Sequence, residues 1–137
     1  MQALRILLVE DEVFLSELYT DVLDGMGHEV CGNAATEAGA IDAAAATKPD
    51  LMIVDARLAS GSGEHAMVEI LRRGFVPHVF ISGDKARVTD LRATAIVLQK
   101  PFFVSDLARA MQRALAAAPS LPQLANATMD APTGTRS

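Results

Sequence analysis

Short apolar runs in this sequence end in residues that can bind a metal ion or a phosphoryl group. Two adjacent acids, a third acid, a hydroxyl and an ammonium stand at or just after the ends of four such runs, namely Glu10 and Asp11, Asp55, Ser82 and Lys100. If the runs are parallel strands, their carboxyl ends meet at one edge of a sheet and these side chains converge. Carboxylates placed close together raise one another's pKa unless a cation offsets their charge. The pattern therefore predicts a site for Mg²⁺, which binds carboxylates together with water and phosphate oxygens.

The same residue types suit phosphoryl transfer. An aspartate such as Asp55 can attack phosphorus and form an aspartyl phosphate. A metal ion and the Lys100 ammonium would neutralise charge on the transferred oxygens, while the Ser82 hydroxyl and backbone N–H groups would donate hydrogen bonds to them. Taken singly, each residue has an ordinary structural interpretation, such as an acid at a turn or a solvated lysine. Their shared placement at strand ends favours a functional site.

The elements that would position these residues alternate along the chain. Apolar runs of strand length lie at 6–9, 51–54, 79–81 and 96–98, with a weaker candidate at 29–31. Helical spacing of apolar residues fills 12–26, 36–47, 64–73 and 104–118, and a short helix is predicted within 85–93. Alternating strands and helices imply right-handed crossovers and a parallel sheet covered on both faces. We therefore predict an α/β fold with a doubly wound five-stranded parallel sheet, flavodoxin-like (βα)5, in the strand order 2-1-3-4-5.

Length and composition limit the other possibilities. The chain has 137 residues, which predicts one domain at 1–118 followed by a flexible tail at 119–137 without an output domain. A net charge of −5 disfavours nucleic-acid binding, which needs a basic surface. Cys31 is the only cysteine, so neither an internal disulfide nor a cysteine zinc site is expected. No apolar run reaches the roughly 18 residues of a membrane span and no signal peptide precedes the first strand, which favours the cytoplasm.

Four motifs in the sequence resemble those of bacterial two-component response-regulator receiver domains. They occur in the order of that family across residues 4–118, at 6–12 (ILLVEDE), 49–55 (PDLMIVD), 80–83 (FISG) and 100–102 (KPF). One such motif would be weak evidence, whereas four in order, each at a predicted strand end, favour membership. The resemblance covers nearly all of the predicted domain.

The resemblance implies a magnesium site. By position, Glu10 and Asp11 match the family's acidic pair, with Asp11 the direct Mg²⁺ ligand and Glu10 acting through water. Asp55 belongs to the same ligand set. Arg57, two residues beyond Asp55, matches the position whose backbone carbonyl binds the metal.

The resemblance also implies that Asp55 accepts a phosphoryl group from a phosphohistidine. Ser82 matches the hydroxyl residue that moves to the phosphate on activation, and Lys100 matches the lysine of the family's site. The bond between Lys100 and Pro101 is expected to be cis. Val97 stands where many receivers carry an aromatic switch residue, so the sequence departs from the family at that position.

The resemblance therefore implies a receiver, not an enzyme, that signals by protein–protein contact. Because no output module follows the last predicted helix, we expect a stand-alone single-domain regulator, or a receiver cut from a longer chain at the tail. Its expected partners are a sensor histidine kinase or histidine phosphotransfer protein, and a downstream protein target, with neither nucleic acid nor membrane bound. The chain would be a monomer or would dimerise on phosphorylation. A phosphate sink or relay shuttle is the alternative output.

Other classes of function are weighed against this one. A magnesium-dependent phosphatase with an aspartyl nucleophile commonly has an acid two residues after that nucleophile, where this chain has Arg57. Such enzymes also usually need a cap domain. A nucleotide-binding module is disfavoured because neither glycine-rich phosphate motif follows the first strand. A receiver that is never phosphorylated is disfavoured by the complete set of site residues.

Three further expectations concern packing. The apolar stripe of the first helix is expected in the core, at Phe14, Leu18, Val22 and Met26. One of Phe102 and Phe103 should face the core and the other should lie near an output surface. The three histidines are expected at the surface or in loops, at His28, His65 and His78.

Overall fold

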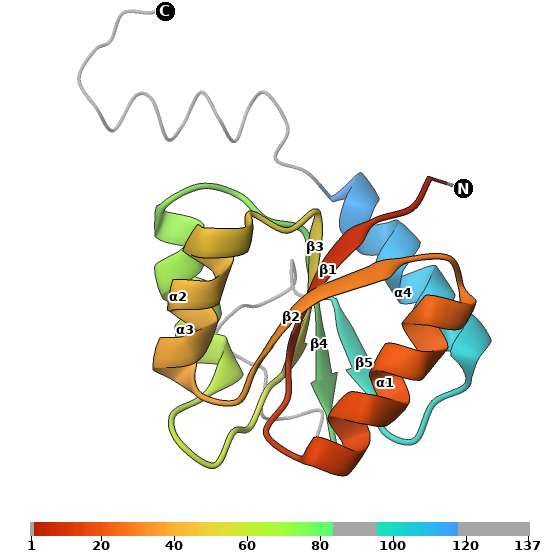
Figure 1. The fold of residues 1–137 in the computed structure, drawn as a ribbon, viewed down its shortest axis with the longest axis horizontal. Coiled ribbons are helices and arrows are strands. Elements are labelled where there is room, and N and C mark those ends of the chain that lie inside the picture. Colours follow the sequence, from red (N-terminus) through yellow and green to blue (C-terminus); the bar gives the residue numbers. More distant parts are fainter. Residues whose placement is uncertain (1, 84–95, 118–137) are drawn as a thin grey trace, which may run out of the picture.

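Five parallel strands form one sheet with helices on both of its faces (Figure 1). The structure is a computed structural model and describes residues 2–83 and 96–117. Its elements are β1 (Arg5–Val9), α1 (Val13–Gly25), β2 (Glu29–Ala34), α2 (Glu37–Thr47), β3 (Leu51–Asp55), α3 (Gly63–Arg72), β4 (His78–Ser82), β5 (Val97–Gln99) and α4 (Val104–Ala116). The strand order is β2-β1-β3-β4-β5 and every neighbouring pair is parallel. The predicted doubly wound, flavodoxin-like sheet is confirmed.

The predicted elements differ from the observed ones mainly at their ends. The weaker strand candidate at 29–31 is the full edge strand β2, and β5 begins and ends one residue later than predicted. The helix predicted within 85–93 and the tail predicted at 119–137 lie outside the described residues. Both therefore stay predictions.

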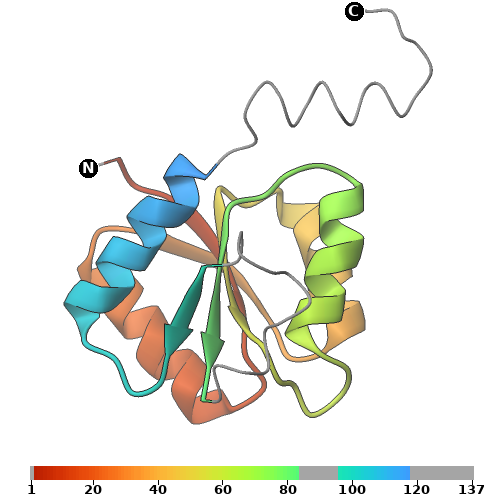
Figure 2. The ribbon, with the colours of Figure 1, turned by 180° about the vertical axis from the view of Figure 1, so that it is seen from behind.

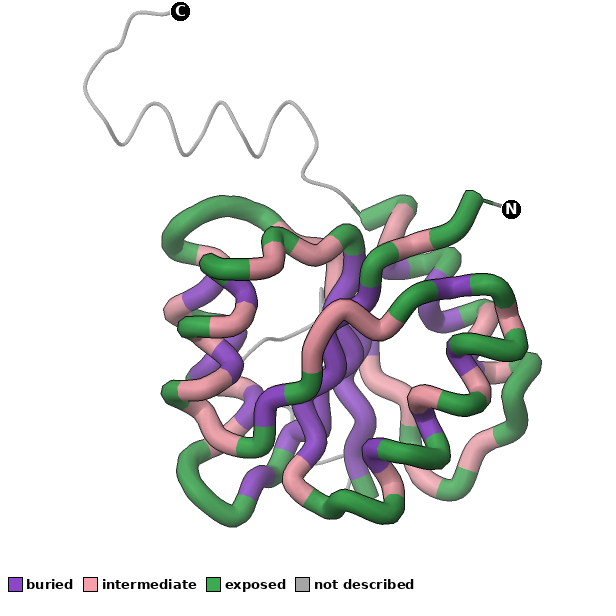
Figure 3. Tube along the Cα trace, in the orientation of Figure 1, coloured by how far each residue is buried: buried purple, intermediate pink, exposed green. Residues whose placement is uncertain are grey.

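The sheet is buried on both faces because alternate residues of each strand point to opposite sides. One core cluster lies between the sheet and helices α2 and α3 and contains Leu7, Met52 and Phe80. The other lies between the sheet and helices α1 and α4 and contains Ile6 and Ile53. Figure 2 shows the two helix pairs on opposite sides of the sheet, and Figure 3 shows the buried strands at the centre. Burial on both faces explains why the apolar runs of the sequence are continuous.

The expectation that the α1 stripe packs in the core is wrong at the start of the helix. Phe14 is 75% exposed and Leu18 is 47% exposed, whereas Leu23 is fully buried. Val22 and Met26, at the end of the stripe, do pack against the core. Residues four apart on a helix advance by about 40° beyond one full turn, so a stripe at that spacing drifts around the helix. Here it begins on the solvent side and ends on the core side.

The two phenylalanines that follow β5 point in different directions, as predicted. Phe102 packs against the core, and its ring stacks on Tyr19 with the two centroids 6.0 Å apart. Phe103 is 77% exposed. The bond between Lys100 and Pro101 is cis, which confirms the expectation from the resemblance. Because Phe102 contacts Tyr19, the turn between β5 and α4 lies against α1.

The three histidines have different environments. His65 is exposed, as expected. His28 lies in the loop before β2 but is buried, and its Nδ1 accepts a hydrogen bond from the Leu4 backbone N–H at 3.1 Å. His78 lies on β4 with its ring edge-on to Phe80, and burial lowers its pKa. The expectation of a surface or loop position therefore holds for His65 and His28, although His28 is buried in its loop, and is wrong for His78, which lies on a strand.

Candidate metal and phosphoacceptor site

The carboxyl ends of the inner strands meet at one edge of the sheet, where the side chains predicted to do chemistry converge. Asp55 at the end of β3 pairs with Ile81, and Ser82 at the end of β4 pairs with Gln99. A cavity of about 500 Å³ opens at this edge, and its lining consists of Asp11, Glu12, Asp55, Ala56, Arg57, Leu58, Ala59, Ser82, Gly83 and Lys100. The structure thus brings together the predicted site residues, with Glu10 buried beside the cavity.

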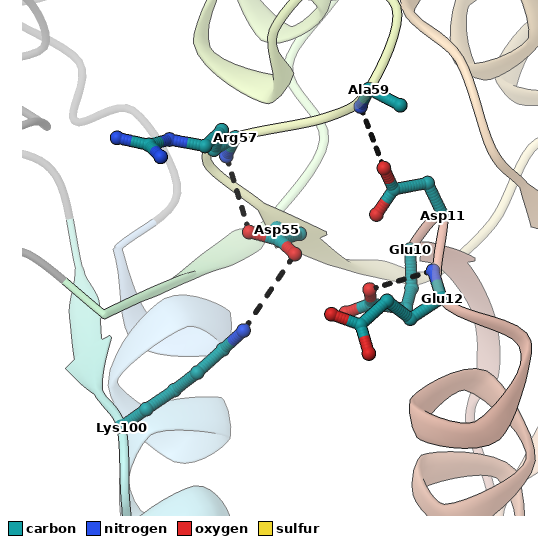
Figure 4. Close-up of polar contacts among 7 residues, drawn as sticks. All are labelled: Glu10, Asp11, Glu12, Asp55, Arg57, Ala59 and Lys100. Atoms are coloured by element: carbon teal, nitrogen blue, oxygen red, sulfur yellow. Dashed lines mark hydrogen bonds and ion pairs between the residues drawn. The ribbon is translucent and has the colours of Figure 1, made fainter.

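Three carboxylates crowd together at this cavity. Glu10, Asp11 and Asp55 each present an oxygen within 4.8 Å of the other two (Figure 4). The Oε2 atom of Glu10 accepts a hydrogen bond from the Glu12 backbone N–H at 3.1 Å. Its Oε1 atom is buried and has no hydrogen-bond partner among the described residues. A buried carboxylate oxygen without a donor is costly, so this all-oxygen donor set fits a hard cation such as Mg²⁺.

Glu10 has an unusually high pKa for a carboxyl group. Burial, and to a smaller extent the negative charge of Asp55, raises the pKa of Glu10 from 4.5 to about 7. The Glu12 backbone N–H and the Lys100 ammonium act in the opposite direction but do not cancel the burial. Without a cation, Glu10 therefore holds its proton close to neutral pH.

Asp55 is held at both carboxylate oxygens. Its Oδ1 accepts a hydrogen bond from the Arg57 backbone N–H at 3.1 Å, and its Oδ2 lies 3.7 Å from the Lys100 ammonium nitrogen. The Asp55 side chain is 11% exposed and that of Lys100 is 31% exposed, so the pair is partly shielded from water. Two contacts from different elements thus fix the direction in which Asp55 faces the cavity (Figure 4).

The loop 56–62 between β3 and α3 positions the remaining acid. The Ala59 backbone N–H donates a hydrogen bond to the Oδ2 atom of Asp11 at 2.6 Å. Leu58, next to Ala59, is buried in the core and anchors this loop. Gly63 begins α3, and a Cβ there would lie 2.1 Å from the Asp55 carbonyl oxygen, so only glycine lets α3 start this close to β3. The acids are therefore held by backbone groups of a loop that is packed on both ends.

The other predicted residues occupy their expected places. Ser82 is buried at the end of β4, and its carbonyl oxygen accepts a hydrogen bond from the Lys100 backbone N–H at 2.9 Å. Arg57 lines the cavity, and its guanidinium points away from the acids (Figure 4). Val97, which the resemblance matches to the aromatic switch position, is half-buried against the core between the sheet and α2 and α3.

Two contacts at this edge were not predicted from the sequence. The hydrogen bond from Ala59 to Asp11 uses a backbone group, and the side chain of an alanine gives no signal of it. The carboxylate of Glu37 on α2 accepts a hydrogen bond from the Ser62 backbone N–H at 3.1 Å, across 25 residues of sequence. The only local signal for Glu37 is its place in the first turn of a helix, which is common for acids.

Comparison with known proteins shows the family to which the chain belongs. Residues 6–112 match the family described as "Response regulator receiver domain". This match covers most of the chain, which therefore belongs to the receiver domains of two-component systems. The relatives PdtaR, PhyR and CheY are signalling regulators rather than enzymes.

Individual relatives show the same class of protein. The chain is 31% identical over 115 residues to the "Transcriptional regulatory protein PdtaR" of Mycobacterium tuberculosis, which covers 81% of this chain and 56% of that protein. It is 33% identical over 117 residues to the "Phyllosphere-induced regulator PhyR" of Methylorubrum extorquens, covering 82% of this chain and 44% of that protein. The chain thus spans about half the length of the curated relatives it matches.

A solved structure gives the same result for the fold. The receiver domain of PhyR from Erythrobacter litoralis is 32% identical, with a TM-score of 0.78, and the match covers 88% of this chain and 95% of that one. Within the described residues, no helix has the length and apolar character needed to cross a membrane.

The raised pKa of Glu10 predicts a pH dependence of stability. In the unfolded chain Glu10 releases its proton near pH 4.5, whereas in the folded metal-free protein it keeps the proton until about pH 7. The unfolded state therefore binds fewer protons in this interval, and the free energy of unfolding falls as the pH rises through it. Glu10→Gln, which has no proton to lose, should show a smaller fall. Urea unfolding of both proteins with EDTA measures this, and parallel curves for the two would contradict the prediction.

Proposed function

We propose that this receiver domain accepts a phosphoryl group from a phosphohistidine onto Asp55, with Mg²⁺ bound by the neighbouring acids. The observation that carries the proposal is the position of the Asp55 carboxylate between the Lys100 ammonium, 3.7 Å away, and two further carboxylates within 4.8 Å. A nucleophile placed between a fixed cation and a cation-binding set is what phosphoryl transfer needs.

The proposed step uses the Oδ2 atom of the Asp55 carboxylate. The Arg57 backbone N–H engages Oδ1, which leaves Oδ2 facing Lys100 and the cavity. Oδ2 attacks phosphorus, the bond between phosphorus and the donor's histidine nitrogen breaks, and the electron pair stays on that nitrogen. The product is an aspartyl phosphate, and its later hydrolysis returns Asp55 to the carboxylate.

The surrounding residues have separate roles in this proposal. Lys100 attracts the oxygens of the incoming phosphoryl group, and the Ser82 hydroxyl, which lines the same cavity, donates a hydrogen bond to them. Asp11 and Asp55 would bind Mg²⁺ directly, Glu10 through water, and Arg57 through its backbone carbonyl. When bound, Mg²⁺ neutralises the carboxylates and the charge on the transferred oxygens. Arg57 stands two residues after Asp55 in the sequence, where an aspartyl phosphatase commonly has a second acid, which disfavours that alternative.

The exposed apolar residues beside the cavity support a protein as the phosphodonor. Val13, Phe14 and Leu18 on α1 are 72%, 75% and 47% exposed, and Phe103 and Val104 at the start of α4 are 77% and 52% exposed. Stacking between the rings of α1 and the β5–α4 turn brings the two groups to the same end of the molecule (Figure 1). Exposed apolar residues gathered in this way indicate a protein-binding surface.

We infer that this surface binds a sensor histidine kinase or a histidine phosphotransfer protein, next to the acceptor that it phosphorylates. Such a partner places the chain in the cytoplasm. The signal then leaves by contact of the phosphorylated domain with a downstream protein, or the domain serves as a phosphate sink or shuttle.

The acceptor role predicts a specific loss of modification. Incubation with acetyl phosphate and Mg²⁺ should add one phosphoryl group to the wild-type protein, detected by intact-mass spectrometry. Asp55→Asn should remove this modification, because an amide is not a nucleophile toward phosphorus, and EDTA should suppress it in the wild type. Lys100→Ala should slow the reaction by about 10²-fold or more, as for loss of one charge-stabilising group. Persistent modification of Asp55→Asn would remove Asp55 from the acceptor role.

If the exposed apolar residues of α1 and the start of α4 bind the phosphodonor, changing them should slow transfer from a protein donor but not from a small molecule. Phe14→Ser and Phe103→Ser should each slow transfer from a phosphorylated histidine phosphotransfer protein by about tenfold, as for loss of an interface anchor worth more than about 1 kcal/mol. Neither should change the rate with phosphoramidate. Phe75→Ser is the matched control. Phe75 is also exposed, but it precedes β4 and so lies at the amino ends of the strands, away from Asp55. Equal slowing by Phe75→Ser would exclude this surface.

A further inference from the structure

Glu37, outside the acid cluster, joins the start of α2 to the loop 56–62. Its Oε1 atom accepts a hydrogen bond from the Ser62 backbone N–H at 3.1 Å. Its own backbone N–H donates to the Ser60 carbonyl oxygen, also at 3.1 Å, and Thr36 and Ser60 form a parallel bridge. The Glu37 side chain is 31% exposed, so these bonds are partly shielded from water. One residue therefore holds this loop at two points.

The same loop carries the backbone groups that hold two of the site acids. The Arg57 N–H donates to Asp55 and the Ala59 N–H donates to Asp11. Leu58 lies between these two donors and is buried in the core. The residues that contact the acids and those that contact Glu37 are thus one to five residues apart along the loop. A shift at Ser60 would move the Ala59 N–H directly.

The sequence is adapted to this contact at Gly61. The φ of Gly61 is +84°, and a Cβ there would lie 2.5 Å from both the Cβ and the Oε1 of Glu37. Any other residue would push the carboxylate away from Ser62 and would also strain the backbone. Glycine at this position lets Glu37 reach across the loop.

We propose that Glu37 is a positioning residue for the metal and phosphoacceptor site. By holding Ser60 and Ser62, it keeps the Ala59 N–H on Asp11 and Arg57 at the cavity, so that the ligands are ordered before Mg²⁺ binds. Groups that orient metal ligands without touching the metal commonly have large effects on affinity. This inference rests on the proposed function, since it assumes that the acids bind Mg²⁺.

A purely structural role for Glu37 makes a different prediction. As an acid in the first turn of α2, Glu37 also interacts favourably with the helix dipole. Removal of its charge alone would then be as harmful as removal of the side chain. Thr36 provides the matched control, because its hydroxyl caps α2 by accepting a hydrogen bond from the Gly39 N–H at 3.0 Å and is not bonded to the loop. Thr36→Ala should weaken the helix start and leave the loop in place.

The experiment compares Glu37→Ala, Glu37→Gln and Thr36→Ala in the full chain. Calorimetric titration with MgCl₂ gives the metal affinity, and NMR hydrogen exchange of the Ala59 amide without metal reports on the bond to Asp11. Glu37→Ala should weaken Mg²⁺ binding and speed Ala59 exchange, each by about tenfold. Glu37→Gln keeps an acceptor for the Ser62 N–H. Its Mg²⁺ affinity and Ala59 exchange rate should therefore stay close to those of the wild type. Thr36→Ala should lower the free energy of unfolding and change neither.

Three results would overturn the inference. In the first, the Ala59 amide of Glu37→Ala exchanges at the wild-type rate. In the second, Glu37→Gln loses as much Mg²⁺ affinity and Ala59 protection as Glu37→Ala. In the third, Thr36→Ala shows that same loss. If the wild-type protein itself binds no Mg²⁺, the proposed metal site fails, whereas the exchange of Ala59 still decides whether Glu37 holds the loop. The two failures are therefore distinguishable.

Discussion

The crowding of three carboxylates at the carboxyl edge of the sheet is the constraint on which the rest of the site depends. Glu10, Asp11 and Asp55 come within 4.8 Å of one another, and one oxygen of Glu10 is buried without a partner among the described residues. Lys100 offsets this charge from the side of Asp55. Such a cluster lowers the stability of the metal-free fold, and proteins retain such costs where function needs them. A divalent cation removes the cost and prepares Asp55 for a second anionic group.

The apolar core allows this cluster to exist. β1 and β3 are paired and buried on both faces, so the residues at their ends cannot separate to relieve repulsion. The loop 56–62 then fixes the acids from the opposite side, through the Arg57 and Ala59 backbone N–H groups. Glu37 and the buried Leu58 keep the loop in place. The strands hold the acids from one side and the loop 56–62 holds them from the other. The carboxylate oxygens are therefore ordered and face one another.

Much of this arrangement could be predicted from the sequence, because it follows from strand ends. Continuous apolar runs identify strands buried on both faces, and parallel pairing puts the residues after them at one edge. What could not be predicted depends on backbone geometry or on distant packing. The Ala59 N–H has no side-chain signal, and Glu37 reaches the loop only because α2 and α3 lie side by side. The prediction for the α1 stripe is wrong at Phe14, which is exposed to solvent. A spacing of four residues fits a face that stays in the core and also a face that turns toward solvent.

The most direct test of the account is the free energy of unfolding, with and without Mg²⁺, of the wild-type protein and of Asp11→Asn. An asparagine oxygen can still accept the Ala59 N–H, so this change removes charge and little else. Because Asp11→Asn removes one of the three crowded charges, it should be more stable than the wild type in EDTA. Mg²⁺ at a hundredfold excess over its Kd should stabilise the wild type by about 2.7 kcal/mol and the variant much less. A variant less stable than the wild type in EDTA, with no effect of Mg²⁺ on either protein, would contradict it.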